Sequence, residues 1–155
     1  MSSVLQKFYD AFIEKDAEEM VDNYHPDIRF EDPAFGVLHG KDAADMWRML
    51  CKNGKDLQVT YEIIQEDEHK GIVQWEAKYT FSRTGRQVHN KVLAKFRIRN
   101  GLIINHEDSF NLKVWAKQAM GFTGLVFGGT AFFKEKLRKN THRLLRNFQQ
   151  KSLKS

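Results

Sequence analysis

The sequence has little of several features that mark specialised classes of protein. Its 155 residues include one cysteine, Cys51, so no disulfide can form within the chain, as is usual in a reducing compartment. No run of about 18 apolar residues occurs, and a membrane-spanning helix is not expected. The first residues, MSSVLQKFYD, lack the basic and apolar regions of a signal peptide. These absences favour a cytoplasmic protein.

Metal and nucleotide motifs are missing as well. The six histidines show no HxxH or HExxH spacing, and neither a GxGxxG sequence nor a Walker loop occurs. We therefore expect no metal and no cofactor.

Positive charge is scarce in most of the chain and concentrated at its end. Residues 1–110 carry 15 basic and 19 acidic side chains, whereas residues 134–155 carry eight basic side chains against Glu135. The overall charge of +5 therefore describes a basic tail and not a nucleic-acid-binding domain. No nucleic-acid partner is expected.

The first third of the chain has helical periodicity. Apolar residues recur at helical spacing from Leu5 to Ile13, and Asp16 with Glu19 is a capping box for a second helix, which His25-Pro26 is expected to end. Residues 28–32 (IRFED) indicate a short strand. A third helix is expected from Asp42 to Asn53.

From residue 57 to residue 110 the period of the apolar residues changes to two. Four runs of alternating apolar and polar residues are separated by turn sequences such as SRTGR and RNG, which is typical of antiparallel hairpins. Three helices followed by a four-stranded meander predict an α+β fold, with one apolar sheet face over the helices.

Three stretches carry a resemblance to a known superfamily. FYDAFIEKDAEEMVDNYHPDIRFEDP, HGKDAADMWRML and NGLIINHEDSFNLKVWAKQAMG resemble the nuclear transport factor 2-like superfamily, which includes SnoaL-like polyketide cyclases, ketosteroid isomerases and limonene-epoxide hydrolases. The resemblance covers roughly residues 4–121. It implies a cone-shaped, curved antiparallel sheet around a deep apolar cavity, with the first helix closing one end. It also implies a homodimer formed through the outer face of the sheet.

Asp32 is the first candidate catalytic residue. The sequence FEDP resembles the VEDP-type motif whose aspartate moves a proton in ketosteroid isomerases, and burial in an apolar cavity would raise the pKa of such a base. The alternative is that Asp32 only stabilises a turn at the end of its strand. By this resemblance the oxyanion donors of those isomerases fall on Phe8, with Tyr9 one residue away, and on Leu93 or Ala94, so authentic ketosteroid isomerisation is not expected.

His106 and Asp108 form the second candidate pair. HEDSFN resembles the RDYFD-type strand end of limonene-epoxide hydrolases, although Asn111 replaces its last acid. A period of two places Ile104, His106 and Asp108 on one face, where the pair could activate water or relay a proton. A buried hydrogen bond that only orients the strand is the alternative.

Most other candidates are aromatic residues expected to form the cavity wall, joined by one amide on the apolar face of its strand. The predicted substrate-binding set is Phe8, Tyr9, Phe12, Phe30, Trp47, Trp75, Tyr79, Asn90 and Phe110.

Residues 122–155 extend beyond the expected domain of residues 1–121. Gly121, Gly124, Gly128 and Gly129 predict a flexible apolar loop. Apolar residues then alternate with basic ones at helical spacing, which predicts a basic amphipathic helix. We expect it to pack on the domain or a partner. Peripheral contact with an anionic membrane is the less favoured alternative.

The sequence therefore predicts a SnoaL-like pocket protein for a small apolar molecule. As an enzyme it would be a cofactor-free isomerase, cyclase or hydrolase that uses an aspartate base. The alternative is a non-catalytic ligand-binding or assembly module.

Overall fold

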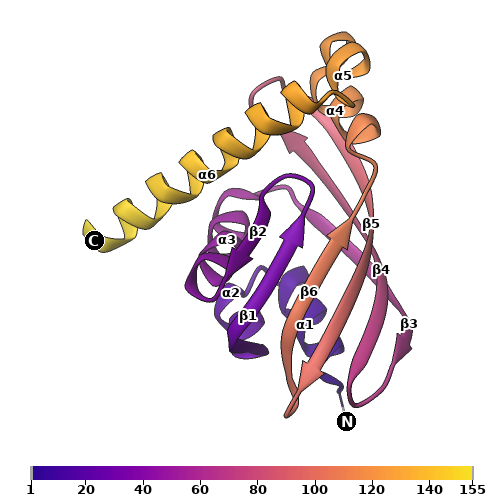
Figure 1. Cartoon of the computed structure of the whole chain (residues 1–155), viewed down its shortest axis with the longest axis vertical. Coiled ribbons are helices and arrows are strands. Elements are labelled where there is room, and N and C mark those ends of the chain that lie inside the picture. Colours follow the sequence, from indigo (N-terminus) through magenta and orange to yellow (C-terminus); the bar gives the residue numbers. More distant parts are fainter. Residues whose placement is uncertain (1, 155) are drawn as a thin grey trace.

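The computed structural model describes residues 2–154 (Figure 1). In chain order the elements are α1 (Val4–Ile13), α2 (Ala17–Asp22), β1 (Tyr24–Asp32), β2 (Gly36–His39), α3 (Lys41–Asn53), β3 (Gln58–Glu66), β4 (Lys70–Phe81), β5 (Arg86–Arg99), β6 (Leu102–Ser109), α4 (Leu112–Met120), α5 (Phe122–Phe127) and α6 (Ala131–Lys154).

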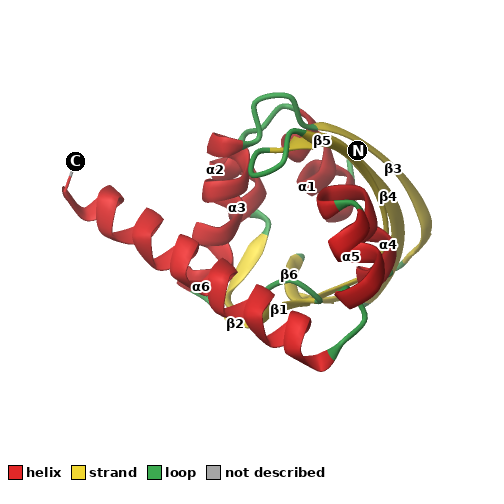
Figure 2. Ribbon diagram, turned by 90° about the horizontal axis from the view of Figure 1, so that it is seen from above, coloured by secondary structure: helices red, strands yellow, loops and turns green. Residues whose placement is uncertain are grey.

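The strands form one curved six-stranded sheet in the order β2-β1-β6-β5-β4-β3. Seen from above, strands β3 to β5 curve around α1, and α6 crosses the side of β1 and β2 (Figure 2). This arrangement confirms the predicted α+β cone with N-terminal helices and a C-terminal helix. The strand β2 was not predicted, because four residues are too few to show a period.

One pairing in the sheet is parallel. Strands β1 and β6 run side by side in the same direction, with Phe30 opposite His106 and Glu31 opposite Glu107. All other neighbouring strands are antiparallel. The parallel pair joins the N-terminal hairpin to the meander and brings residues about 75 positions apart into register.

The start of α2 follows the predicted cap. The Asp16 carboxylate accepts a hydrogen bond from the Glu19 backbone N–H at 3.1 Å and begins α2. The predicted end at His25-Pro26 is wrong, because α2 stops at Asp22 and Tyr24 already belongs to β1. Tyr24 is buried against the core as a strand residue, with its hydroxyl in a hydrogen-bond chain described below.

Aromatic side chains fill the space between α1 and the sheet. Phe8, Tyr9, Phe12 and Trp47 are at most 2% exposed and contact one another and the sheet through their rings. Packing at this density stabilises the fold by roughly 1.5–3 kcal/mol per large side chain. Where the resemblance implied a deep apolar cavity, these rings occupy the interior.

Strand β6 contains an irregularity that changes its phase. Its register against β5 shifts between Arg97 and Ile98, and Ile103 is fully buried in place of the predicted Ile104. His106 and Asp108 still face the interior, because the shift comes before them.

The segment after Gly121 is helical, so the prediction of a flexible loop there is wrong. Helix α5 packs so closely on α4 that a Cβ atom at Gly124 would lie 1.9 Å from the Ala116 carbonyl oxygen. The glycine is thus required for a close approach of two helices.

Helix α6 packs on the β1–β2 turn and on α3. The Thr141 hydroxyl donates to the Ala34 carbonyl at 2.9 Å, and His142 Nε2 donates to the Phe35 carbonyl at 2.6 Å. Leu145 is 3% exposed, and Gln149 Nε2 donates to Asp42. In residues 2–154 we find no helix with the length and apolar character needed to cross a membrane.

Candidate functional site

Asp32 is the last residue of β1 and leads into the turn toward β2. Its Oδ1 accepts hydrogen bonds from the backbone N–H groups of Ala34 (3.0 Å) and Phe35 (2.6 Å). This is the turn that the sequence offered as the alternative to catalysis. The side chain is nevertheless also part of a pocket.

The register of the parallel pair places Asp32 beside Asp108. Phe30 lies opposite His106 and both are buried, so they share the inner face of the sheet. Asp32 and Asp108 follow each of them by two residues, and side chains two apart point to the same face of a strand. The two carboxylates therefore meet at the same end of the same face.

A pocket of about 350 Å³ opens at this point. The turn after β1, the end of β6 and the starts of α4 and α6 surround it. Its lining combines four acids, two bases and three apolar residues: Glu31, Asp32, Glu107, Asp108, Lys134, Arg138, Pro33, Phe110 and Leu112.

The environment of Asp32 favours the protonated carboxyl. Burial raises its pKa to about 7, and the negative charge of Asp108 acts in the same direction. The two backbone N–H groups and the Arg138 guanidinium oppose this shift, since each stabilises the carboxylate. A carboxyl with such a pKa can take up or release a proton near neutral pH.

Asp108 is the end of a buried hydrogen-bond chain. Trp47 Nε1 donates to the Tyr24 hydroxyl at 2.7 Å, and that hydroxyl contacts His106 Nδ1 at 2.7 Å. His106 Nε2 contacts Asp108 Oδ1 at 2.8 Å, and Trp75 Nε1 donates to the same oxygen at 3.3 Å. If Tyr24 donates to Nδ1 and Nε2–H donates to Asp108, every polar hydrogen in the chain has an acceptor.

This chain fixes one oxygen of Asp108 and leaves the other available. Asp108 is 4% exposed and lines the pocket, and we find no hydrogen bond to its Oδ2 from residues 2–154. Oδ2 can therefore accept a hydrogen bond from a bound molecule or a water. The buried histidine behind it holds the carboxylate in one orientation.

The structure places the predicted wall residues in three kinds of surroundings. Phe8, Tyr9, Phe12, Phe30 and Trp47 are buried in the core, and only Phe110 of the predicted substrate-binding residues lines this pocket. Trp75 contacts Asp108, and Tyr79 accepts a hydrogen bond from Trp115 of α4 at 2.7 Å.

Two predicted polar positions have no partner in the described chain. Asn90 is half-buried beside Val88 and Val92, and its side chain makes no hydrogen bond within residues 2–154. The Tyr9 hydroxyl is fully buried and likewise lacks a partner among those residues. Burial raises the pKa of Tyr9 well above its usual value, so this hydroxyl stays neutral.

Three contributors to the site were missed from the sequence. Tyr24 lies in the segment that was predicted to be helical up to His25-Pro26, and nothing in the sequence around it indicates a hydrogen-bonding role. Lys134 and Arg138 come from α6 and reach the pocket only through tertiary packing, for which the sequence contains no local signal.

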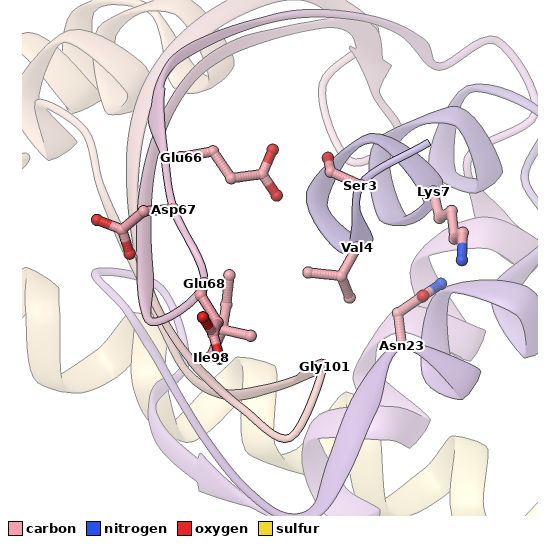
Figure 3. Close-up of a pocket in the computed structure, with 9 residues that line it drawn as sticks. All are labelled: Ser3, Val4, Lys7, Asn23, Glu66, Asp67, Glu68, Ile98 and Gly101. Carbon is pink, nitrogen blue, oxygen red and sulfur yellow. The ribbon is translucent and has the colours of Figure 1, made fainter. Parts of the chain in front are cut away.

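Another pocket, of about 490 Å³, lies at the opposite end of the sheet (Figure 3). It lies between the start of α1 and the β3–β4 and β5–β6 turns, with Lys7, Glu66 and Glu68 among its lining residues. It contains none of the predicted site residues.

Metal and thiol chemistry find no support in the part of the chain that is described. No group of three or more His, Cys, Asp and Glu side chains within residues 2–154 is arranged to hold a metal ion. Cys51 is buried, and burial raises the pKa of its thiol to about 11. It is therefore protonated at neutral pH.

The family of the chain follows from its sequence. A model of the SnoaL-like domain matches residues 5–106, so the chain belongs to the SnoaL-like family, and its fold is that of nuclear transport factor 2-like proteins. The match ends before Asp108 and before the C-terminal helices. The comparison with curated proteins gives no match.

Solved structures show the same fold. A nuclear transport factor 2-like protein of unknown function from Burkholderia pseudomallei is 23% identical, with a TM-score of 0.65 over 77% of this chain and 99% of its own. TerC co-crystallised with polyporic acid is 18% identical, with a TM-score of 0.62 over 74% and 94%. An LEH-like epoxide hydrolase from M. tuberculosis is 18% identical, with a TM-score of 0.58 over 81% and 88%.

Proposed function

We propose that this protein is a cofactor-free acid–base enzyme for a small, mainly apolar molecule that carries a carbonyl group. The observation that carries the proposal is the pairing of Asp32, whose pKa is about 7, with Asp108 in one pocket. The reaction class is isomerisation, cyclisation or hydrolysis, in which a proton moves to or from the substrate. The fold alone does not decide among these.

Asp32 is the general base in this mechanism. Its free oxygen removes a proton from the carbon next to the carbonyl, while Oδ1 stays bonded to the Ala34 and Phe35 N–H groups. Such a step contributes about 10²–10⁴ in rate. The negative charge that develops on the substrate oxygen is stabilised by Arg138.

Asp108 acts on the second proton, with His106 behind it. The Asp108 carboxylate accepts a hydrogen bond from the substrate or from a water in the pocket, and the Nε2–H of the imidazole holds that carboxylate in place. Tyr24 holds the histidine in one orientation through Nδ1. His106, Tyr24 and Trp47 lie behind the acid, so they position it without touching the substrate.

Similar proteins support the class of ligand. One structural neighbour is named as an epoxide hydrolase and another was crystallised with polyporic acid, so related folds act on or hold small organic molecules. Phe110, Leu112 and Pro33 supply the apolar wall here.

A non-catalytic binding or assembly module is the second candidate. Two observations favour it: aromatic side chains fill the core, and Asp32 already accepts the backbone hydrogen bonds of a turn. Under this candidate the pocket holds a ligand and moves no proton.

Proton exchange in D₂O separates the two candidates. We would first select, from a panel of small cyclic and aromatic ketones, those that raise the melting temperature of the protein. NMR then follows the exchange of their α-protons with the wild type, with Asp32→Asn, and with Asp27→Asn as a matched control at an exposed position of the same strand.

Catalysis predicts fast exchange that Asp32→Asn reduces by about 10²–10⁴ and Asp27→Asn leaves unchanged. Exchange no faster than in buffer for every ketone that binds would contradict catalysis and support the binding module.

We also propose a homodimer in the cytoplasm, as the sequence predicted. The proposed contact is the outer face of the sheet, which is polar on β4 and β5, with Glu76 and Lys91 opposite each other. Light scattering at micromolar concentration tests the assembly.

A further inference from the structure

The region around α5 exposes large apolar side chains. Phe122 is 79% exposed and Phe132 is 75% exposed, and between them lie three further exposed residues, Leu125, Val126 and Phe127. We call these five residues the α5 patch. They lie at the end of the molecule far from the N-terminus, where α5 and the start of α6 lie together (Figure 1). Clustered exposed apolar residues of this size mark an interaction surface.

The geometry of α5 keeps the patch away from the protein body. Gly124 is the contact of this helix with α4, through Ala116. Phe122 and Val126 lie on the opposite side of the same short helix, since each residue turns by about 100°, and Leu125 lies on its flank. Because the side of α5 that carries Gly124 packs on α4, these apolar side chains point away from the protein body.

A basic row continues from the patch along α6. Phe132, Lys136, Lys139, Arg143 and Arg146 follow at intervals of three or four residues, so they share one helical face. All five are exposed. The opposite face packs on the protein through Thr141 and Leu145.

One acid accompanies this row. Glu135 pairs with Lys139 at 3.3 Å, and the other three basic side chains of the row form no ion pair within residues 2–154. The row therefore keeps a positive potential next to an apolar tip.

We propose that the α5 patch and the basic row together bind the surface of an anionic lipid bilayer. The apolar side chains enter the boundary between headgroups and acyl chains, and the basic row lies against the headgroups. This is surface binding by a side of the molecule, independent of the chemistry in the pocket.

Charge favours a lipid surface over the other occupants. A symmetric contact between two copies through this face would bring the basic rows of both copies together, which like charges oppose. A nucleic acid would match the charge but would leave the phenylalanines of the tip without an apolar environment. Anionic lipid is the partner that matches both parts of the surface.

Vesicle co-sedimentation of the full chain tests this proposal. The probes are vesicles of phosphatidylcholine alone and with about 30% phosphatidylserine, at about 0.05 M and about 1 M salt. One variant removes the tip (Phe122→Ser with Phe132→Ser) and one removes charge (Lys136→Gln, Lys139→Gln and Arg143→Gln).

The matched control removes the same charge from exposed positions away from α6 and from the outer face of β5, by Lys7→Gln, Lys55→Gln and Lys70→Gln. All the altered residues are exposed, so circular dichroism should show the same fold for every variant.

The proposal predicts binding to the anionic vesicles at low salt, weaker binding at high salt, and none to phosphatidylcholine alone. The charge variant should bind roughly 100-fold more weakly, at about fivefold for each basic residue near the surface. The tip variant should lose most binding, and the control variant should keep it.

Absence of binding by the wild type would overturn the proposal, as would an equal loss in the control variant. A dimer in light scattering that the tip variant converts to a monomer would also overturn it, because the patch would then be covered by a second copy.

Discussion

Asp32 combines a structural and a chemical role in one carboxyl group. Its Oδ1 holds the turn, whereas the burial of the whole group raises its pKa to about 7. An unfolded chain ionises this group near pH 4. Between about pH 4 and about pH 7 the folded protein therefore binds more protons than the unfolded chain, and stability falls as the pH rises.

Asp32→Asn should thus be more stable than the wild type above pH 7. The asparagine keeps an oxygen for the Ala34 and Phe35 N–H groups but has no charge to bury. We expect a gain of about 1–3 kcal/mol at pH 8 and little difference at pH 4. Urea unfolding at both pH values measures it, and a difference that does not change with pH would contradict the assignment.

Two buried tyrosines provide a matched test of the hydrogen-bond chain. Tyr24→Phe leaves Trp47 Nε1 and His106 Nδ1 without partners, which should cost about 1–3 kcal/mol of stability. Tyr9→Phe removes a buried hydroxyl that has no partner in residues 2–154, so it should be neutral or stabilising. Denaturant titration compares them, and equal losses would argue against the chain.

At the scale of residues, the sequence predicted the candidate side chains that lie near the end of a recognisable strand. Asp32, His106 and Asp108 share one region because both strands end there. That they meet depends on the parallel pairing of β1 with β6, which no local pattern contains. Tyr24 and Arg138 were missed for the same reason, since their roles arise only from tertiary contacts.

At the scale of elements, the close contact between α4 and α5 rests on one residue. Gly124→Ala would place a methyl group 1.9 Å from the Ala116 carbonyl oxygen, so α5 should leave its position. We expect faster amide hydrogen exchange in α4 and α5, with a loss of about 1–3 kcal/mol. Gly129→Ala is the control, since its nearest contact would be Lys113 Cδ at 3.8 Å. Equal exchange in both variants would be inconsistent with this packing.

Helix α6 also contributes to the electrostatics of the site. Arg138 lowers the pKa of Asp32 through its positive charge. Arg138→Gln should therefore raise that pKa above 7, whereas Arg143→Gln on the exposed face of α6 should leave it unchanged. Carbon NMR of the labelled carboxyl follows both, and an unchanged or lower value in Arg138→Gln would exclude this contribution.

Periodicity predicted the elements that have one buried face. The apolar spacing of α1 and α3 and the alternation in β4 and β5 reflect such faces directly. The sequence pattern did not predict α5, where glycine allows a close contact between helices and does not form a loop. It also misplaced the end of α2. The docking of α6 on the β1–β2 turn uses backbone carbonyls as acceptors, and these leave no trace in the sequence.

At the scale of the whole molecule, the SnoaL-like part and the C-terminal helices form one site. The family match covers residues 5–106, but Arg138 and Lys134 lie beyond it and line the pocket with Asp32. The matched part includes Asp32, whereas Asp108 lies two residues beyond the match. The extension supplies the bases opposite them.

The pKa of Asp32 in the intact protein tests the acid–base account most directly. It can be measured by carbon NMR of aspartate labelled at the carboxyl carbon, with Asp32→Asn to assign the signal. The account predicts a midpoint near 7 for this carboxyl. A midpoint near 4, the value of a solvated aspartate, would contradict it and leave Asp32 as a residue of the turn.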